Sequence, residues 1–74
     1  MTEAEFDIFP PGLRGLNRLA IGLNALMAGK QIANWHLGHW SDRTQARHSV
    51  LFDNDDDAAL AKSSHGDARR DMAD

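Results

Sequence analysis

The segment Trp35-His36-Leu37-Gly38-His39-Trp40 holds the side chains best suited to chemistry in this sequence. His36 and His39 are three residues apart, so on a helix both imidazoles face the same side. Two neutral imidazoles supply half of the four ligands of a structural zinc site, and they also bind Ni²⁺ or Cu²⁺. A twofold dimer would bring a second pair, and an imidazole-ligated tetrapyrrole is a further alternative. The favoured interpretation is a partly buried aromatic patch without a cofactor, with His36 and His39 as the candidate metal ligands if a metal is bound.

The sequence contains no recognisable catalytic constellation. It has no Gly-x-Ser-x-Gly elbow, no Walker loop and no Gly-x-Gly-x-x-Gly fingerprint. The acidic run that begins at Asp53 resembles a calcium loop only in its density of carboxylates. The sixth and twelfth positions, where such a loop needs Gly and Glu, are Ala58 and Ser64. We therefore predict that the protein is not an enzyme.

The charges divide the 74-residue chain into three parts. Residues 1–10 carry a net charge of −3, residues 11–50 of +4 and residues 51–74 of −4. A basic centre between acidic ends is typical of an interaction protein with charge-guided partners, although solvated ends that keep the chain soluble would give the same pattern. The sequence pI of about 5.7 makes nucleic acid an improbable partner.

Residues 12–28 show the clearest helical periodicity in the chain. Their apolar side chains recur at spacings of three and four residues and fall on one face of a helix. Gly15, Gly22 and Gly29 recur at intervals of seven. We interpret Gly15 and Gly22 as a glycine lane, a strip of helix surface without side chains against which a second helix can pack closely. We interpret Gly29 as the C-cap.

The remaining segments complete a predicted all-α fold. Beyond Gly29 the apolar stripe loses phase, so we expect a break there and a second amphipathic helix over residues 31–49. The domain organisation is then an acidic N-terminal arm (1–10), a helical hairpin (11–52) and an acidic, largely disordered tail (53–74). The tail is expected to be mobile because only Leu60 and Met72 are sizeable apolar residues.

A hairpin of this size has too little apolar area to bury its own helix stripe. Of 20 core-forming residues, 18 precede Asp53, and the absence of Cys excludes disulfides. We therefore predict that a homodimer or a larger protein completes the fold, and that the chain is an adaptor or regulator. The predicted partner-binding residues are Leu16, Leu19, Leu23, Leu26, Met27 and Trp40.

Two further partner classes remain as alternatives. Leu, Trp and basic residues in the central segment also suit a helix that lies on a membrane surface, although the acidic ends oppose binding to anionic lipid. The acidic tail suits an inhibitor that mimics nucleic acid. The lack of Cys and of a basic, apolar N-terminal signal favours a cytoplasmic protein.

Overall fold

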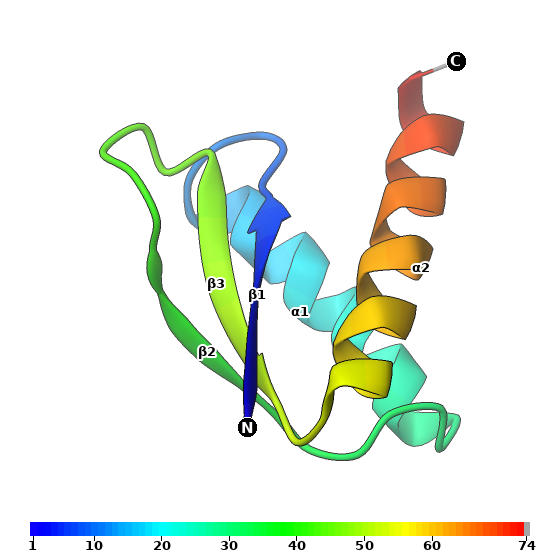
Figure 1. Cartoon of the computed structure of the whole chain (residues 1–74). Coiled ribbons are helices and arrows are strands. Elements are labelled where there is room, and N and C mark those ends of the chain that lie inside the picture. Colours follow the sequence, from blue (N-terminus) through cyan, green and yellow to red (C-terminus); the bar gives the residue numbers. More distant parts are fainter. Residues whose placement is uncertain (74) are drawn as a thin grey trace.

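The computed structural model describes the secondary structure of residues 1–73 and the side chains of residues 1–65. Three strands and two helices follow one another along the chain (Figure 1). They are β1 (Thr2–Asp7), α1 (Leu13–Ala28), β2 (Trp35–Trp40), β3 (Arg47–Phe52) and α2 (Asp55–Ala73).

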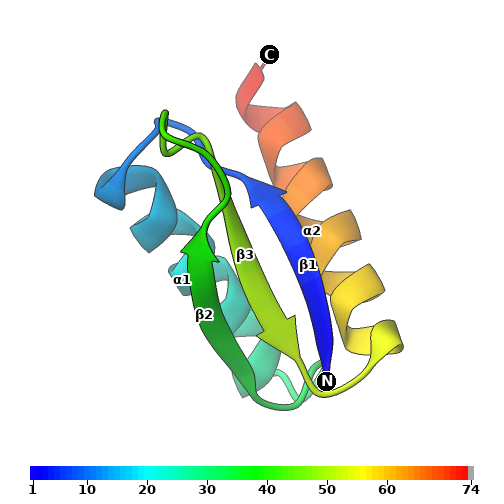
Figure 2. The ribbon, with the colours of Figure 1, turned by 60° about the vertical axis from the view of Figure 1, so that its left-hand side comes forward.

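The strands form one antiparallel sheet in the order β1-β3-β2. β3 lies in the centre and is antiparallel to both neighbours, so β1 and β2 run in the same direction with β3 between them. Figure 2 shows both helices on the same side of the sheet, with α1 behind β2 and β3 and with α2 beside β1. This is the split β-α-β arrangement, and it leaves one face of the sheet without a covering helix.

The predicted all-α fold is therefore wrong, and the protein belongs to the α+β class. Residues 31–49, which we expected to form a second helix, contain β2, a turn and the beginning of β3. The segment 53–74, which we expected to be a disordered tail, contains α2. Only α1 agrees with the predicted hairpin, since its bounds fall within the expected range of 12–28.

An irregularity in β2 accounts for the wrong assignment of that segment. The pairing register with β3 shifts between Leu37 and Trp40, so Gly38 and His39 together lie opposite Ser49. Such a β-bulge inserts one extra residue and interrupts the alternation of side chains. The interruption brings Trp35, Leu37 and Trp40 to one face at spacings of two and three, a pattern that does not match a regular strand.

The core lies between the sheet and the two helices. Thr2, Ala4 and Phe6 of β1 face the helices, while the intervening acidic residues face away. Leu19 and Leu23 of α1 are 3% and 2% exposed. The other buried apolar residues are Phe6, Ile8, Ile32, Val50, Phe52, Ala58 and Ala61. The chain thus covers the centre of its own helix stripe, at Leu19 and Leu23, contrary to the expectation that only a partner could do so.

Two glycines determine where α1 ends and how closely it packs. Gly29 caps the C-terminus of α1, as predicted, and donates its N–H to the carbonyl of Ala25 at 3.0 Å. Gly15 lies against the backbone of Phe9 and Pro10, where a Cβ would overlap the Pro10 carbonyl. The close approach therefore exists at Gly15, but it is made to a loop and not to a second helix.

At Gly22, in contrast, no atom of another described segment lies within 4 Å of an added Cβ, so the predicted glycine lane does not continue. The N-terminus of α2 is capped by Asn54, whose Oδ1 accepts the N–H of Asp57 at 2.8 Å. Two acidic side chains of the first turn of α2 are also bound within the chain. Asp55 accepts a hydrogen bond from the Thr2 hydroxyl, and Asp57 accepts one from the N–H of Ala33.

Candidate protein-binding surface

The outer edge of β2 is the exposed strand edge of this sheet, because β2 pairs only with β3. Its backbone orientation follows from two hydrogen bonds. Ser41 N–H donates to the carbonyl of Arg47, so the backbone groups of Arg47 point toward β2. Ile8 N–H donates to the carbonyl of Ala46, the residue before β3, so the backbone groups of Ala46 point toward β1. By alternation, the backbone groups of His48, Val50 and Phe52 also point toward β1.

Alternation along the strands then fixes which groups of β2 face outward. The backbone groups of Leu51 point toward β2, and Leu51 lies opposite His36, so the backbone groups of His36 point toward β3. Trp35 and Leu37 flank His36 and therefore direct their N–H and C=O groups outward. Trp40 lies opposite His48, whose backbone groups point toward β1. The backbone groups of Trp40 are therefore not bonded to β3 and also face outward. Three residues of β2 thus present free backbone donors and acceptors at this edge.

The bulge is held by Ser49, a buried residue of the central strand. The Ser49 hydroxyl accepts the N–H of His39 at 2.9 Å and lies 3.2 Å from both the His39 carbonyl and Nδ1. A Cβ at Gly38 would overlap the Ser49 Oγ, so only glycine fits this position without a shift. The residue types at these positions therefore fix the shape of the edge.

An open groove lies directly beside this edge, between α1 and β2. Its volume is about 440 Å³, and the residues that line it are Leu13, Arg14, Leu16, Asn17, Ala20 and Leu37. Leu13 is 75% exposed and Leu37 is 43% exposed. Large apolar side chains beside unpaired backbone groups are the features that an added strand or helix from another chain would cover.

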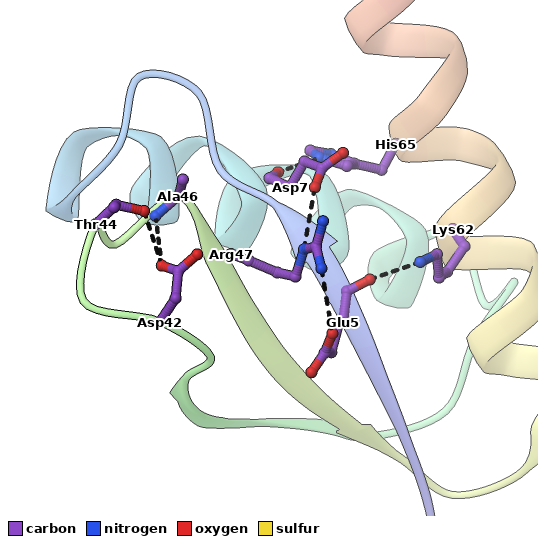
Figure 3. A network of polar contacts seen from close by, with 8 residues as sticks. All are labelled: Glu5, Asp7, Asp42, Thr44, Ala46, Arg47, Lys62 and His65. Carbon is purple, nitrogen blue, oxygen red and sulfur yellow. Dashed lines mark hydrogen bonds and ion pairs between the residues drawn. The ribbon is translucent and has the colours of Figure 1, made fainter.

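At the opposite edge of the sheet, side chains of α2 bind two carbonyls of β1. Lys62 Nζ donates to the carbonyl of Glu5 at 2.6 Å, and His65 Nε2 donates to the carbonyl of Asp7 at 2.7 Å (Figure 3). The Lys62 ammonium also lies 5.6 Å from the centroid of the Phe6 ring. The two edges of the sheet therefore differ, because α2 occupies two carbonyls of β1 and, among the described side chains, neither helix does so for β2.

The uncovered face of the sheet is polar. Arg47 lies between two carboxylates of β1, with Nη1 3.8 Å from Glu5 Oε2 and Nε 3.4 Å from Asp7 Oδ1 (Figure 3). All three side chains are about half exposed, so each pair contributes at most about 1 kcal/mol to stability. At the end of the sheet, Asp42 accepts hydrogen bonds from Thr44 and Ala46 and closes the turn between β2 and β3.

The six predicted partner-binding residues do not form one surface. Leu19 and Leu23 belong to the core, and Leu16, Leu26 and Trp40 are partly buried against it. Met27 is the most exposed of the six, at 39%. Only Leu16 lines the groove. Trp40 contacts His48, with ring centroids 4.7 Å apart and the planes at 77°.

Leu13 and Leu37 were not predicted from the sequence as candidate surface residues. Leu37 was assigned to a helix, where its free backbone groups would have been hydrogen-bonded. The available signal was the lack of charge in the segment Trp35–Trp40, which leaves an edge strand without the acidic or basic residues that usually protect one.

His36 and His39 lie on β2 and not on a helix. Both side chains are exposed, and His39 is associated with the Ser49 hydroxyl. Among residues 1–65, no group of three or more His, Asp or Glu side chains is arranged to hold a metal ion. The two imidazoles therefore have no further protein ligand near them within one copy of the described chain.

Within the described residues, neither helix combines the length and the apolar character that a membrane crossing requires. No protein-family model, curated protein or solved structure matches the chain.

Proposed function

We propose that this protein is a small, non-enzymatic protein-binding module, and that it binds through the groove between α1 and β2 together with the free edge of β2. The proposal keeps the adaptor or regulator role expected from the sequence, with the cytoplasm as its compartment. It moves the contact away from Leu19 and Leu23, which are buried, and places it at Leu13, Leu16 and Leu37.

The observation that carries the proposal is the asymmetry of the sheet edges. At the β1 edge, Lys62 and His65 occupy the carbonyls of Glu5 and Asp7. The other has three outward-facing residues and an adjacent apolar groove. Edge strands that are long, uncharged and uncovered pair readily with another chain, and folded proteins usually protect them with charges or with a covering element. An edge left open beside exposed leucines supports a binding role.

Site-specific photo-crosslinking tests this proposal in the native cell. A benzophenone side chain replaces Leu13, which lines the groove, or Ile21, which lies on the same helix outside it. The two positions are matched, since both residues are large and apolar and are 75% and 62% exposed. We expect position 13 to form a discrete covalent product with another protein chain, and position 21 to form none.

Equal crosslinking from both positions would show that the groove has no special role. The absence of any product at position 13 would also contradict the proposal. The mass of the product identifies the partner, which separates a second copy of this chain from a different protein.

A further inference from the structure

The geometry points to a second copy of this chain as the occupant of the β2 edge. We infer that two β2 strands pair antiparallel about a twofold axis at Leu37 and join two three-stranded sheets into one sheet of six strands. This inference rests on the proposed function and specifies its partner.

The bulge makes the edge of β2 symmetrical about Leu37. Trp35 lies two strand positions before Leu37. Trp40 lies two strand positions after it, because Gly38 and His39 share one position opposite Ser49. All three residues are on the helix-facing side and direct their backbone groups outward. A twofold axis at Leu37 therefore places Leu37 opposite the second copy's Leu37 and Trp35 opposite its Trp40.

The backbone groups match in this register. A residue that faces its own counterpart across a twofold axis exchanges both N–H···O bonds when its groups point outward, as those of Leu37 do. Without the bulge, Trp35 and Trp40 would lie on opposite faces, and no twofold pairing would bring them together. The extra residue thus produces the self-complementary pattern.

The side chains also suit a copy of the same chain. The segment Trp35–Trp40 carries no Asp, Glu, Lys or Arg, so self-pairing opposes no like formal charges on β2. The interface gains two Trp–Trp pairs and one Leu–Leu pair, the aromatic and apolar cross-strand contacts that stabilise sheets. The exposed side chains of Leu13 and Leu37 lie beside the new strand pair.

Charge variants at the proposed axis test the inference. Leu37→Lys and Leu37→Asp each place two like charges opposite each other in a dimer and remove an apolar pair. We expect each variant alone to weaken association by at least about tenfold. An equimolar mixture of the two should associate again, because every Lys then faces an Asp. The measurement is sedimentation velocity over a range of concentrations.

Leu60→Lys is the matched control. Leu60 lies on α2 and is 39% exposed, close to the 43% of Leu37, and it does not line the groove. We expect this variant to associate as the native chain does. Circular dichroism checks that each variant is folded.

If the Leu37 variants do not fold, Leu37→Cys replaces them. The native chain has no Cys, so a disulfide in this variant joins two copies. Directly opposed residues of a hydrogen-bonded pair have Cα atoms about 5.5 Å apart, within the range of a disulfide. We expect rapid oxidation to a covalent dimer, and much slower oxidation of Leu60→Cys.

Three outcomes would overturn the inference: a native chain that stays monomeric at every concentration, association that survives both Leu37 charge variants, and a mixture that fails to associate. The proposed function would then depend on the crosslinking at position 13. A product there of any mass other than that of two copies keeps the function and replaces the partner.

Discussion

Gly38 and Ser49 show how two small residues determine the shape of a strand. The Ser49 hydroxyl occupies the space where any other residue at position 38 would place its Cβ, and the same hydroxyl accepts the N–H of His39. A glycine in the middle of a strand ordinarily weakens it. Here the absence of a side chain allows the bulge to close against β3.

The close approach of Gly38 and Ser49 predicts a non-additive pair of substitutions. Gly38→Ala should lower the free energy of unfolding by about 1–3 kcal/mol, because the new methyl group overlaps the Ser49 Oγ. Ser49→Ala should cost about 1 kcal/mol through the lost hydrogen bonds. In the double variant the overlap is relieved, so the combined cost should be clearly less than the sum. Urea unfolding of the four proteins measures the coupling, and strictly additive costs would show that the two residues do not compete for space.

Among the elements, α1 was predictable from sequence because its signal is entirely local. The spacing of Leu19 and Leu23 gives the helix and its buried face without reference to any other segment. β2 and β3 carry no such signal, because their pairing joins residues 35–40 to residues 47–52 through a bulge. At helical spacing, His36, His39 and Trp40 fall on one face as convincingly as the residues of a true helix, and this led to the wrong assignment.

Replacing glycine by alanine should have opposite effects on the free energy of unfolding at two positions of α1. Gly22→Ala should raise the free energy of unfolding by about 1 kcal/mol, since alanine favours helix and nothing lies within 4 Å of its Cβ. Gly15→Ala should lower it by about 1–3 kcal/mol, because the methyl group meets the backbone of Phe9 and Pro10. Thermal unfolding of the two variants compares them directly. Effects of the same sign would contradict the packing at Gly15.

The start of α2 provides a separate test of the C-terminal helix. Asn54→Ala removes the side chain that accepts the Asp57 N–H, and it should cost about 1 kcal/mol. Asp53→Ala changes the neighbouring exposed residue, which makes no capping bond, and serves as the control. Chemical denaturation separates the two, and an equal loss in both variants would argue against Asn54 as the cap.

At the scale of the whole molecule, distant segments cover one another to a greater extent than the sequence patterns predicted. The acidic alternation of Glu3, Glu5 and Asp7 was visible, but it marks a strand only when β3 is known to lie beside it. Ala58 and Ala61 are small, so α2 did not look like part of a core, yet both are buried. The candidate site escaped prediction for the same reason, because a groove between α1 and β2 requires the sheet to exist.

The sheet order predicts a gradient of amide hydrogen exchange. Amides of β3 should exchange slowest, because this strand is paired on both sides. The amides of Trp35 and Leu37 should exchange fast in dilute solution, since they point outward from β2. If the chain pairs with itself, raising its concentration should slow these two amides and leave the exposed turn between β2 and β3 unchanged. Nuclear magnetic resonance resolves the individual amides, and slow exchange of Trp35 and Leu37 at every concentration would contradict the free edge of β2.

Lys62 and His65 have a consequence for how large an assembly can grow. Their hydrogen bonds to β1 hinder the pairing of another strand with β1, whereas the edge of β2 can pair with one further strand. A subunit with a single strand edge available for pairing forms a dimer and no larger assembly, because formation of the dimer occupies the edge that would bind a third subunit. By occupying two carbonyls of β1, α2 therefore also disfavours the open-ended strand addition that produces fibrils.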